Sequence, residues 1–130
     1  MGNALQDASI LQLASRQARW LMVRQNAIAE NIAHVSSPGY RAIDVPPFAE
    51  TLEETSLEVT ATNARHLRLA RDDAREIGRR FQKSLETSHS GNTVSLDQQL
   101  VFANEVRQAY AVNASIVRSM HRLLTSAAKA

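Results

Sequence analysis

Cysteine is absent from this 130-residue chain, which excludes disulfide bonds, thiol catalysis and thiolate metal sites. Aromatic residues are scarce, at 5% of the chain, whereas hydrophobic residues make up 44%. A core of this composition is mostly aliphatic and alanine-rich, which favours helices packed on helices. The length is that of one typical domain.

Long hydrophobic runs are also absent. The longest stretches without Asp, Glu, Lys or Arg are ten residues, for example residues 31–40, whereas a membrane-spanning helix needs about 20 apolar residues. Residues 1–9 (MGNALQDAS) lack a positive n-region and an apolar h-region. We therefore expect neither a transmembrane segment nor an ordinary secretory signal peptide.

Charge is unevenly distributed along the chain, although the formal net charge is only +2. Five acidic residues and no basic residue lie between Ala42 and Ala64, whereas seven basic residues outnumber three acidic ones from Arg65 to Lys83. Arginine clusters bind phosphate, but acids interrupt this run and no Phe, Tyr or Trp precedes Phe81 in it. We expect the basic run to meet the acidic residues 44–58, within one subunit or across two, rather than nucleic acid or anionic lipid.

Helix breakers are missing from both ends of the chain. All three prolines and three of the four glycines lie within residues 38–91. This distribution predicts one structural unit with three parts: an N-terminal helix in 1–37, a turn and middle segment in 38–91, and a C-terminal helix in 92–130. Pro38-Gly39 fits a type II turn that ends the first helix at Ser37, and the Ser95-x-x-Gln98 capping box predicts the start of the last.

Both terminal helices carry apolar residues at alternating steps of three and four, as in a heptad repeat. The fold class we predict is all-α, with the two helices paired as an antiparallel coiled coil. The predicted assembly seam comprises Leu11, Leu21, Gln25, Ile28, Ile32, Val106, Tyr110, Asn113, Val117, Met120 and Leu124. One register sets Gln25 opposite Asn113 as a single polar layer; the alternative is that both amides face water or neighbouring subunits.

The middle segment has weaker signals and is predicted to be short and irregular, with a small hairpin or a short helix. Residues 57–62 (LEVTAT) alternate as in a strand, and residues 73–86 place Ile77, Phe81 and Leu85 at helical spacing. Residues 87–91 (TSHSG) are typical of a polar linker.

The predicted helices are too long for a compact globule of this size. A helix of about 30 residues is about 45 Å long, whereas a compact chain of this length is roughly 36 Å across. An elongated helical pair leaves apolar surface for neighbouring copies, as in an assembly subunit.

No constellation of residues suggests catalysis. The four histidines have no partner at i+4, no GxSxG motif marks a nucleophile, and no glycine-rich loop is available for a phosphate. We predict no catalytic, cofactor or metal site, no small-molecule substrate, and no enzymatic activity. A coiled-coil adaptor or chaperone, or a basic binder of nucleic acid or membrane surfaces, stays open as an alternative.

A motif at the end of the first helix suggests a more specific function. Residues 31–42, NIAHVSSPGYRA, resemble the N-terminal signature of the bacterial flagellar axial proteins, which form the rod, the hook and the hook junction. The matching residues are Asn31, Ala33, Val35, Pro38, Gly39, Tyr40 and Arg41. The chain is too short for the types with large inserted domains, and the stretches TNARHL (62–67) and GNTV (91–94), followed by Asp97, resemble one small proximal rod type. The other small proximal rod type stays open as the alternative.

This resemblance implies a structural subunit of the flagellar basal body rod that polymerises into the drive shaft. It implies as partners copies of the chain, other rod proteins, the rod-to-membrane-ring adaptor and the export gate. It also implies type III export to a periplasmic rod without a cleaved signal peptide. The terminal helices of such proteins are frayed or disordered in the monomer and fold on packing, as expected where binding supplies order.

Overall fold

The computed structural model describes residues 2–56, 80–82 and 87–130. Most of these residues are helical, as predicted. The elements in chain order are α1 (Gly2–Ala33), β1 (Ile43–Asp44), α2 (Phe48–Ser56), β2 (Arg80–Phe81) and α3 (Leu96–Lys129).

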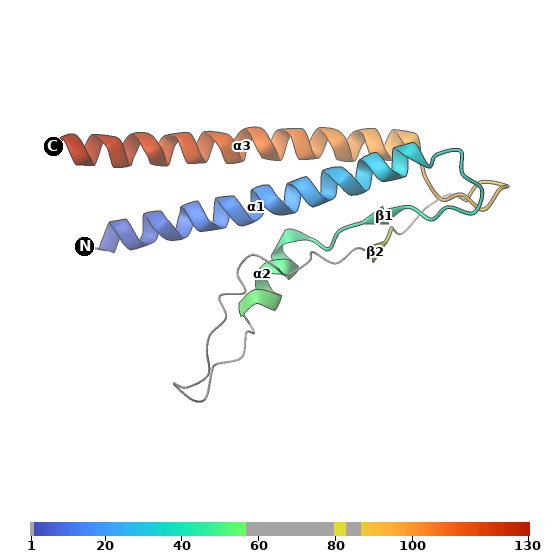
Figure 1. The fold of residues 1–130 in the computed structure, drawn as a ribbon, viewed down its shortest axis with the longest axis horizontal. Coiled ribbons are helices and arrows are strands. Elements are labelled where there is room, and N and C mark those ends of the chain that lie inside the picture. The colour runs from blue at the N-terminus through green and yellow to red at the C-terminus, as the bar shows by residue number, and fades with distance from the viewer. Residues whose placement is uncertain (1, 57–79, 83–86) are drawn as a thin grey trace, which may run out of the picture.

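Helices α1 and α3 form a long helical pair. They lie side by side and run in opposite directions, with both chain ends at the same end of the pair (Figure 1). At the other end, residues 31–44, residue 82 and residues 87–99 gather into what we call the closed end. Helix α2 lies on the side of α1 that faces away from α3 (Figure 1).

Local signals set the start of α3 and the turn after α1. Ser95 has extended φ and ψ angles of −102° and 115°, and its side chain accepts a hydrogen bond from Gln98 N, which confirms the predicted cap. Gly39 has a φ of +71°, and Tyr40 N donates to Ser37 O at 3.3 Å. Both features match the type II turn predicted at Pro38-Gly39.

Helix α1 ends at Ala33, which is four residues before the predicted end at Ser37. The Asn92 side chain donates hydrogen bonds to the carbonyls of His34, Val35 and Ser37 at 2.7–3.1 Å. These carbonyls therefore find a partner outside any helix, so the chain can leave the helical path early.

The middle segment was predicted to hold a small hairpin or a short helix, and it contains both the short helix α2 and a small two-stranded sheet, which the all-α class did not include. β1 pairs antiparallel with β2, with Ile43 opposite Phe81 and Asp44 opposite Arg80. The helix predicted over 73–86 is wrong at Arg80 and Phe81, because backbone pairing to β1 and the hydrogen bond from Gln82 N to Ala42 O outweigh a short helical spacing. The strand predicted at 57–62, and residues 73–79 and 83–86 of that helix, lie outside the described residues.

The core of the helical pair consists of Leu21, Ile28 and Val106. Six partly buried residues pack against it: Trp20, Ile32, Phe102, Ala103, Ala109 and Tyr110. This core is narrow and aliphatic at its centre, in keeping with the few aromatic residues of the chain. Within the described residues, no helix is both long and apolar enough to cross a bilayer.

The predicted register of the two helices is wrong. The Asn113 amide donates to Ala14 O at 2.9 Å and to Gln17 Oε1 at 3.1 Å. Its predicted partner, Gln25, is exposed and lies eight residues, about two helical turns, beyond Gln17. Contacts at the closed end, above all between Asn31 and Gln99, fix a different alignment.

Candidate assembly site

Asn31, in the motif that resembles flagellar axial proteins, is at the centre of the closed end. Its side chain is fully buried and its amide donates to Ile43 O at 2.7 Å and to Gln99 Oε1 at 3.0 Å. Its carbonyl oxygen accepts from Ile43 N at 2.9 Å and from the Tyr40 hydroxyl at 3.3 Å. A single side chain therefore joins α1, the 40–43 segment and α3.

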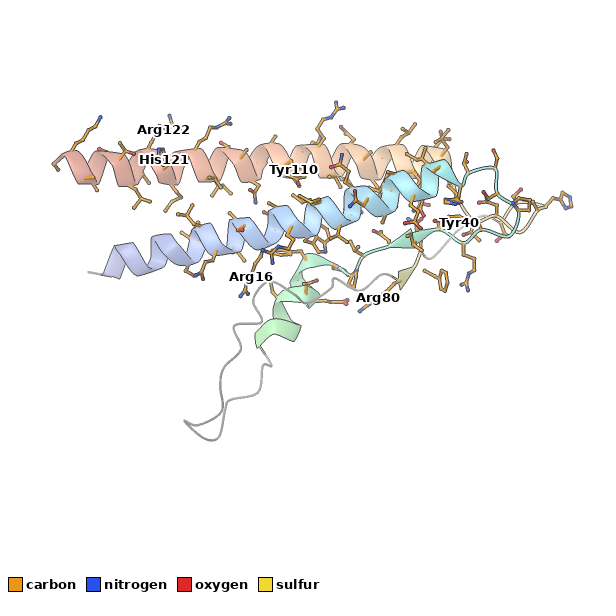
Figure 2. All side chains as sticks on the ribbon, viewed as in Figure 1. Arg16, Tyr40, Arg80, Tyr110, His121 and Arg122 are labelled. Atoms are coloured by element: carbon orange, nitrogen blue, oxygen red, sulfur yellow. The ribbon has the colours of Figure 1, made fainter. Side chains whose placement is uncertain are left out.

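Tyr40 and the two turns complete the closed end. The Tyr40 ring stacks on His34, with ring centroids 4.5 Å apart, and the residue is labelled in Figure 2 at this end of the pair. Gly39 N donates to Ser90 O at 2.9 Å. Gly91 has a φ of +81°, and a Cβ atom on it would lie 3.5 Å from the Gly39 Cα. The two turns are therefore in contact, each with a glycine in the left-handed region.

Asn92 and Thr93 anchor the lead-in to α3. Asn92 is 4% exposed and, besides its three bonds to the end of α1, accepts from Val94 N at 2.7 Å. Thr93 Oγ1 accepts from Ala42 N at 2.9 Å, and Thr93 N donates to Tyr40 O at 3.0 Å. Sequence reasoning gave these two residues no structural role, although they lie in the GNTV stretch that carried part of the family resemblance.

The remaining motif residues lie nearer the surface. Ala33, Val35, Pro38 and Arg41 are exposed, and the Arg41 guanidinium stacks 4.0 Å from the centroid of the exposed Phe81 ring. The motif thus combines residues that build the closed end with residues that remain available to neighbours.

Arg24 forms a second connection that the sequence analysis missed. Its guanidinium lies 3.5 Å from the Asp44 carboxylate and 3.3 Å from that of Glu105, with 16% of its side chain exposed. It also lies over the rings of Trp20 and Phe102, at 5.6 and 5.0 Å from their centroids. Arg24 therefore ties β1 and α3 to α1.

Trp20 fixes the segment that leads to α2. Its indole N–H donates to Pro46 O at 2.7 Å, and its ring packs against Phe48 with centroids 5.9 Å apart. Trp20 lies outside the predicted seam. The only sign of its role in the sequence is that it is an aromatic residue on a mainly polar face.

The structure buries only part of the predicted assembly seam. Leu21, Ile28, Val106, Asn113 and Met120 are buried, and Leu11, Ile32 and Tyr110 are half-buried, whereas Gln25, Val117 and Leu124 are exposed.

Other large apolar side chains of α3 are also exposed, among them Leu100, Val101, Val112, Ile116 and Leu123. A groove of about 610 Å³ is lined by Val117, Arg118, His121 and Arg122. So much apolar surface on one helix is typical of a subunit that packs against neighbours.

Among the described residues, no three His, Asp or Glu side chains gather closely enough to hold a metal ion. In the described part of the chain, all buried side-chain nitrogen and oxygen atoms have hydrogen-bond partners.

Comparison with known proteins identifies the family. No family model matches the chain. A flagellar basal body rod protein FlgB of Agrobacterium fabrum is 34% identical to it over 133 residues, which cover 99% of each chain. The chain belongs to the FlgB family. Two FlgB proteins of Proteus mirabilis are each 32% identical over 85 residues, which cover 58% of this chain and 61% and 60% of theirs.

Membership in the FlgB family confirms the resemblance carried by residues 31–42. It also agrees with the stretches at 62–67 and 91–94, which favoured this proximal rod type over the other small one. The chain is accordingly a structural rod protein of the flagellar basal body. The alternative function, a free-standing coiled-coil adaptor, would not explain why 99% of the chain matches a FlgB protein.

Proposed function

We propose that this FlgB protein polymerises through its terminal helices into the proximal rod of the flagellar drive shaft. The observation that supports this most is the combination of a full-length FlgB match with a long helical pair whose α3 leaves large apolar side chains exposed. Contacts between different surfaces of successive copies do not close on themselves, so they generate a helical tube.

In this proposal the helical pair acts as an antiparallel coiled coil and the closed end fixes its geometry. Asn31, Gly39 and Tyr40 hold the turn, while Ala33, Val35, Pro38 and Arg41 face neighbours. The seam residues Leu21, Ile28 and Val106 stabilise the pair, and Val117 and Leu124 complete their burial only in the rod. Apolar burial of this kind contributes about 25 cal/mol per Å².

The proposal extends to the route and the partners of the chain. The unfolded chain leaves the cell through the type III export channel without a cleaved signal peptide and folds in the periplasmic rod. Its partners are copies of itself, other rod proteins, the rod-to-membrane-ring adaptor and the export gate. The function is mechanical and requires no catalytic residue or cofactor.

The test replaces exposed apolar side chains of α3 in the full chain. Ile116→Glu/Leu123→Glu leaves the core of the pair intact, so we expect export to continue while the rod fails to form and motility is lost. Ser115→Glu/Ser126→Glu adds the same charge at exposed polar positions of α3 and serves as the control. Electron microscopy of isolated basal bodies then shows whether the chain occupies the proximal rod; its absence from the rod would overturn the proposal.

A further inference from the structure

Helix α1 has a second contact face besides the one that packs on α3. Leu21 and Ile28 pack with α3, and a further set of residues lies about a quarter of a turn away around the helix. This second face contacts residues 42–48, which we call the strap because they run along α1 and lead into α2. The residues of the second face are Trp20, Arg24, Ala27 and Asn31.

Specific contacts hold the strap on this face. The Trp20 indole N–H donates to Pro46 O, and the Asn31 amide forms hydrogen bonds with both backbone groups of Ile43. Val45, in the middle of the strap, is only 7% exposed. The strap is therefore packed onto α1, and its position determines where α2 begins.

Two residues of the second face contact the strap and α3 at the same time. The Arg24 guanidinium lies between the Asp44 carboxylate of the strap, at 3.5 Å, and the Glu105 carboxylate of α3, at 3.3 Å. Asn31 bonds to the backbone of the strap and also donates to Gln99 Oε1 of α3 at 3.0 Å. The two residues are seven positions apart, so they lie on the same side of α1, between its two contact faces. We call Arg24 and Asn31 the bridging residues.

A side chain that bridges two segments links the stability of their contacts. When α3 already holds a bridging side chain in place, that side chain loses less conformational freedom as the strap docks. Such coupling is reciprocal, so a docked strap favours packing of α3 to the same extent. Loss of either contact therefore loosens the other.

We propose that Arg24 and Asn31 couple docking of the strap to packing of α3 on α1, so that α2 is held firmly only when the helical pair is closed. The coupling is a property of the single subunit. It rests on the proposed function only for what closes the pair in the cell, namely the neighbours that cover α3 in the rod. A subunit that has joined the rod then differs from a free one in how firmly α2 is held.

The absence of cysteine allows the pair to be closed by a chemical staple. Leu11 and Val117 lie one turn beyond the hydrogen bond from Asn113 to Ala14 O, and Leu11 is about 20 Å from Arg24 along α1. In the whole chain at high dilution, Leu11→Cys/Val117→Cys is joined with a short bis-maleimide. The matched control is the same variant with each cysteine capped separately by N-ethylmaleimide.

Amide hydrogen exchange of Val45 and Thr51 reports how firmly the strap and the first turn of α2 are held. Neither amide bonds to a bridging residue, since they donate to Asp44 Oδ1 and Pro47 O. The stapled protein is expected to protect both amides at least about fivefold more than the capped control does. We call this quotient the staple ratio.

Variants of the bridging contacts test the cause of the coupling. Arg24→Met should lower the staple ratio to less than about twofold, and so should Gln99→Met, which removes the acceptor of Asn31 on α3. Arg24→Lys keeps the charge and folds more readily, but its ammonium lacks the fork that holds two carboxylates, so the ratio should fall as well. Arg107→Met, at an exposed position of α3, is the control and should keep the full ratio.

The outcomes distinguish coupling from a purely structural role and from the proposed function. If stapling leaves the protection of Val45 and Thr51 unchanged, the strap docks independently of α3 and the inference is overturned. If the Arg24 and Gln99 variants lose protection equally with and without the staple, their ratio stays high and the bridging role is wrong. These measurements use the isolated subunit, so absence of the chain from basal bodies would overturn the proposed function alone.

Discussion

Replacing Asn31 with alanine removes a fully buried side chain whose four hydrogen bonds join α1 to Tyr40, Ile43 and Gln99. Gln99 is fully buried, so its carbonyl oxygen cannot turn to water. Ile43 and Tyr40 are half-buried and recover part of their hydrogen bonding from solvent. We therefore expect Asn31→Ala to open the closed end far more often than in the unmodified protein.

The expected cost is about 3–5 kcal/mol, because a lost bond that leaves a buried partner unsatisfied costs about 1–3 kcal/mol and the half-buried groups contribute less. At about 1.4 kcal/mol for each factor of ten, opening becomes at least about a hundredfold more frequent. Amide hydrogen exchange of the full chain measures this frequency directly.

The informative amides are those bonded at the closed end, Gly39 N, Ala42 N and Thr93 N. Their protection should fall together, although none of them donates to Asn31. Asn26→Ala, at an exposed position of the same helix, is the matched control and should leave protection unchanged. Protection that falls less than about tenfold in Asn31→Ala would refute the argument that this side chain fixes the closed end.

The turn at Gly39, the contacts of Arg24 and the free end of α3 can each be tested separately. Gly39→Val places a β-branched residue at a φ of +71°, which costs about 1–3 kcal/mol of backbone strain. Motility should therefore fall while export persists, and normal swimming would show that this turn is not needed for rod assembly. Arg24→Met loses the contacts to Asp44 and Glu105 and should lower the free energy of unfolding by about 1–3 kcal/mol, measured in urea by Trp20 fluorescence. As the control, Arg107→Met at an exposed position should change this free energy by less than about 0.5 kcal/mol. In the dilute monomer, amides 110–130 should exchange almost freely because the apolar face of α3 lacks neighbours, and strong protection there would contradict assembly-coupled folding.

Signals that act over a few residues were sufficient to predict much of the fold. The cap at Ser95 and the turn at Pro38-Gly39 depend on side chains and backbone angles within four residues, and both are present. The long helices follow from the absence of breakers at both ends. These features require no knowledge of distant contacts.

Features decided by distant partners could not be predicted in the same way. The end of α1 at Ala33 depends on Asn92, more than fifty residues away. The strand at Arg80 and Phe81 depends on backbone pairing with β1. Arg24 and Trp20 gained their roles from residues that a heptad pattern does not consider.

The register shows most clearly why periodicity is insufficient. An apolar heptad repeat packs almost equally well after a shift of seven residues, so it cannot choose between alignments. The alignment of α1 and α3 depends instead on two polar contacts, Asn31 with Gln99 and Asn113 with Gln17, which join residues 68 and 96 positions apart. Asn113 does help to fix the register, but its partner is Gln17 rather than the predicted Gln25.

Two polar layers, one near each end of a short apolar core, specify a single alignment at some expense in stability. A slide by one heptad would leave the buried amides of Gln99 and Asn113 without partners, at about 1–3 kcal/mol each. The core between them, Leu21, Ile28 and Val106, is too small to offset such a loss in a wrong register. A chain that folds at its site of assembly benefits from this arrangement, because one fixed alignment presents the same outer face of α3 to every neighbour.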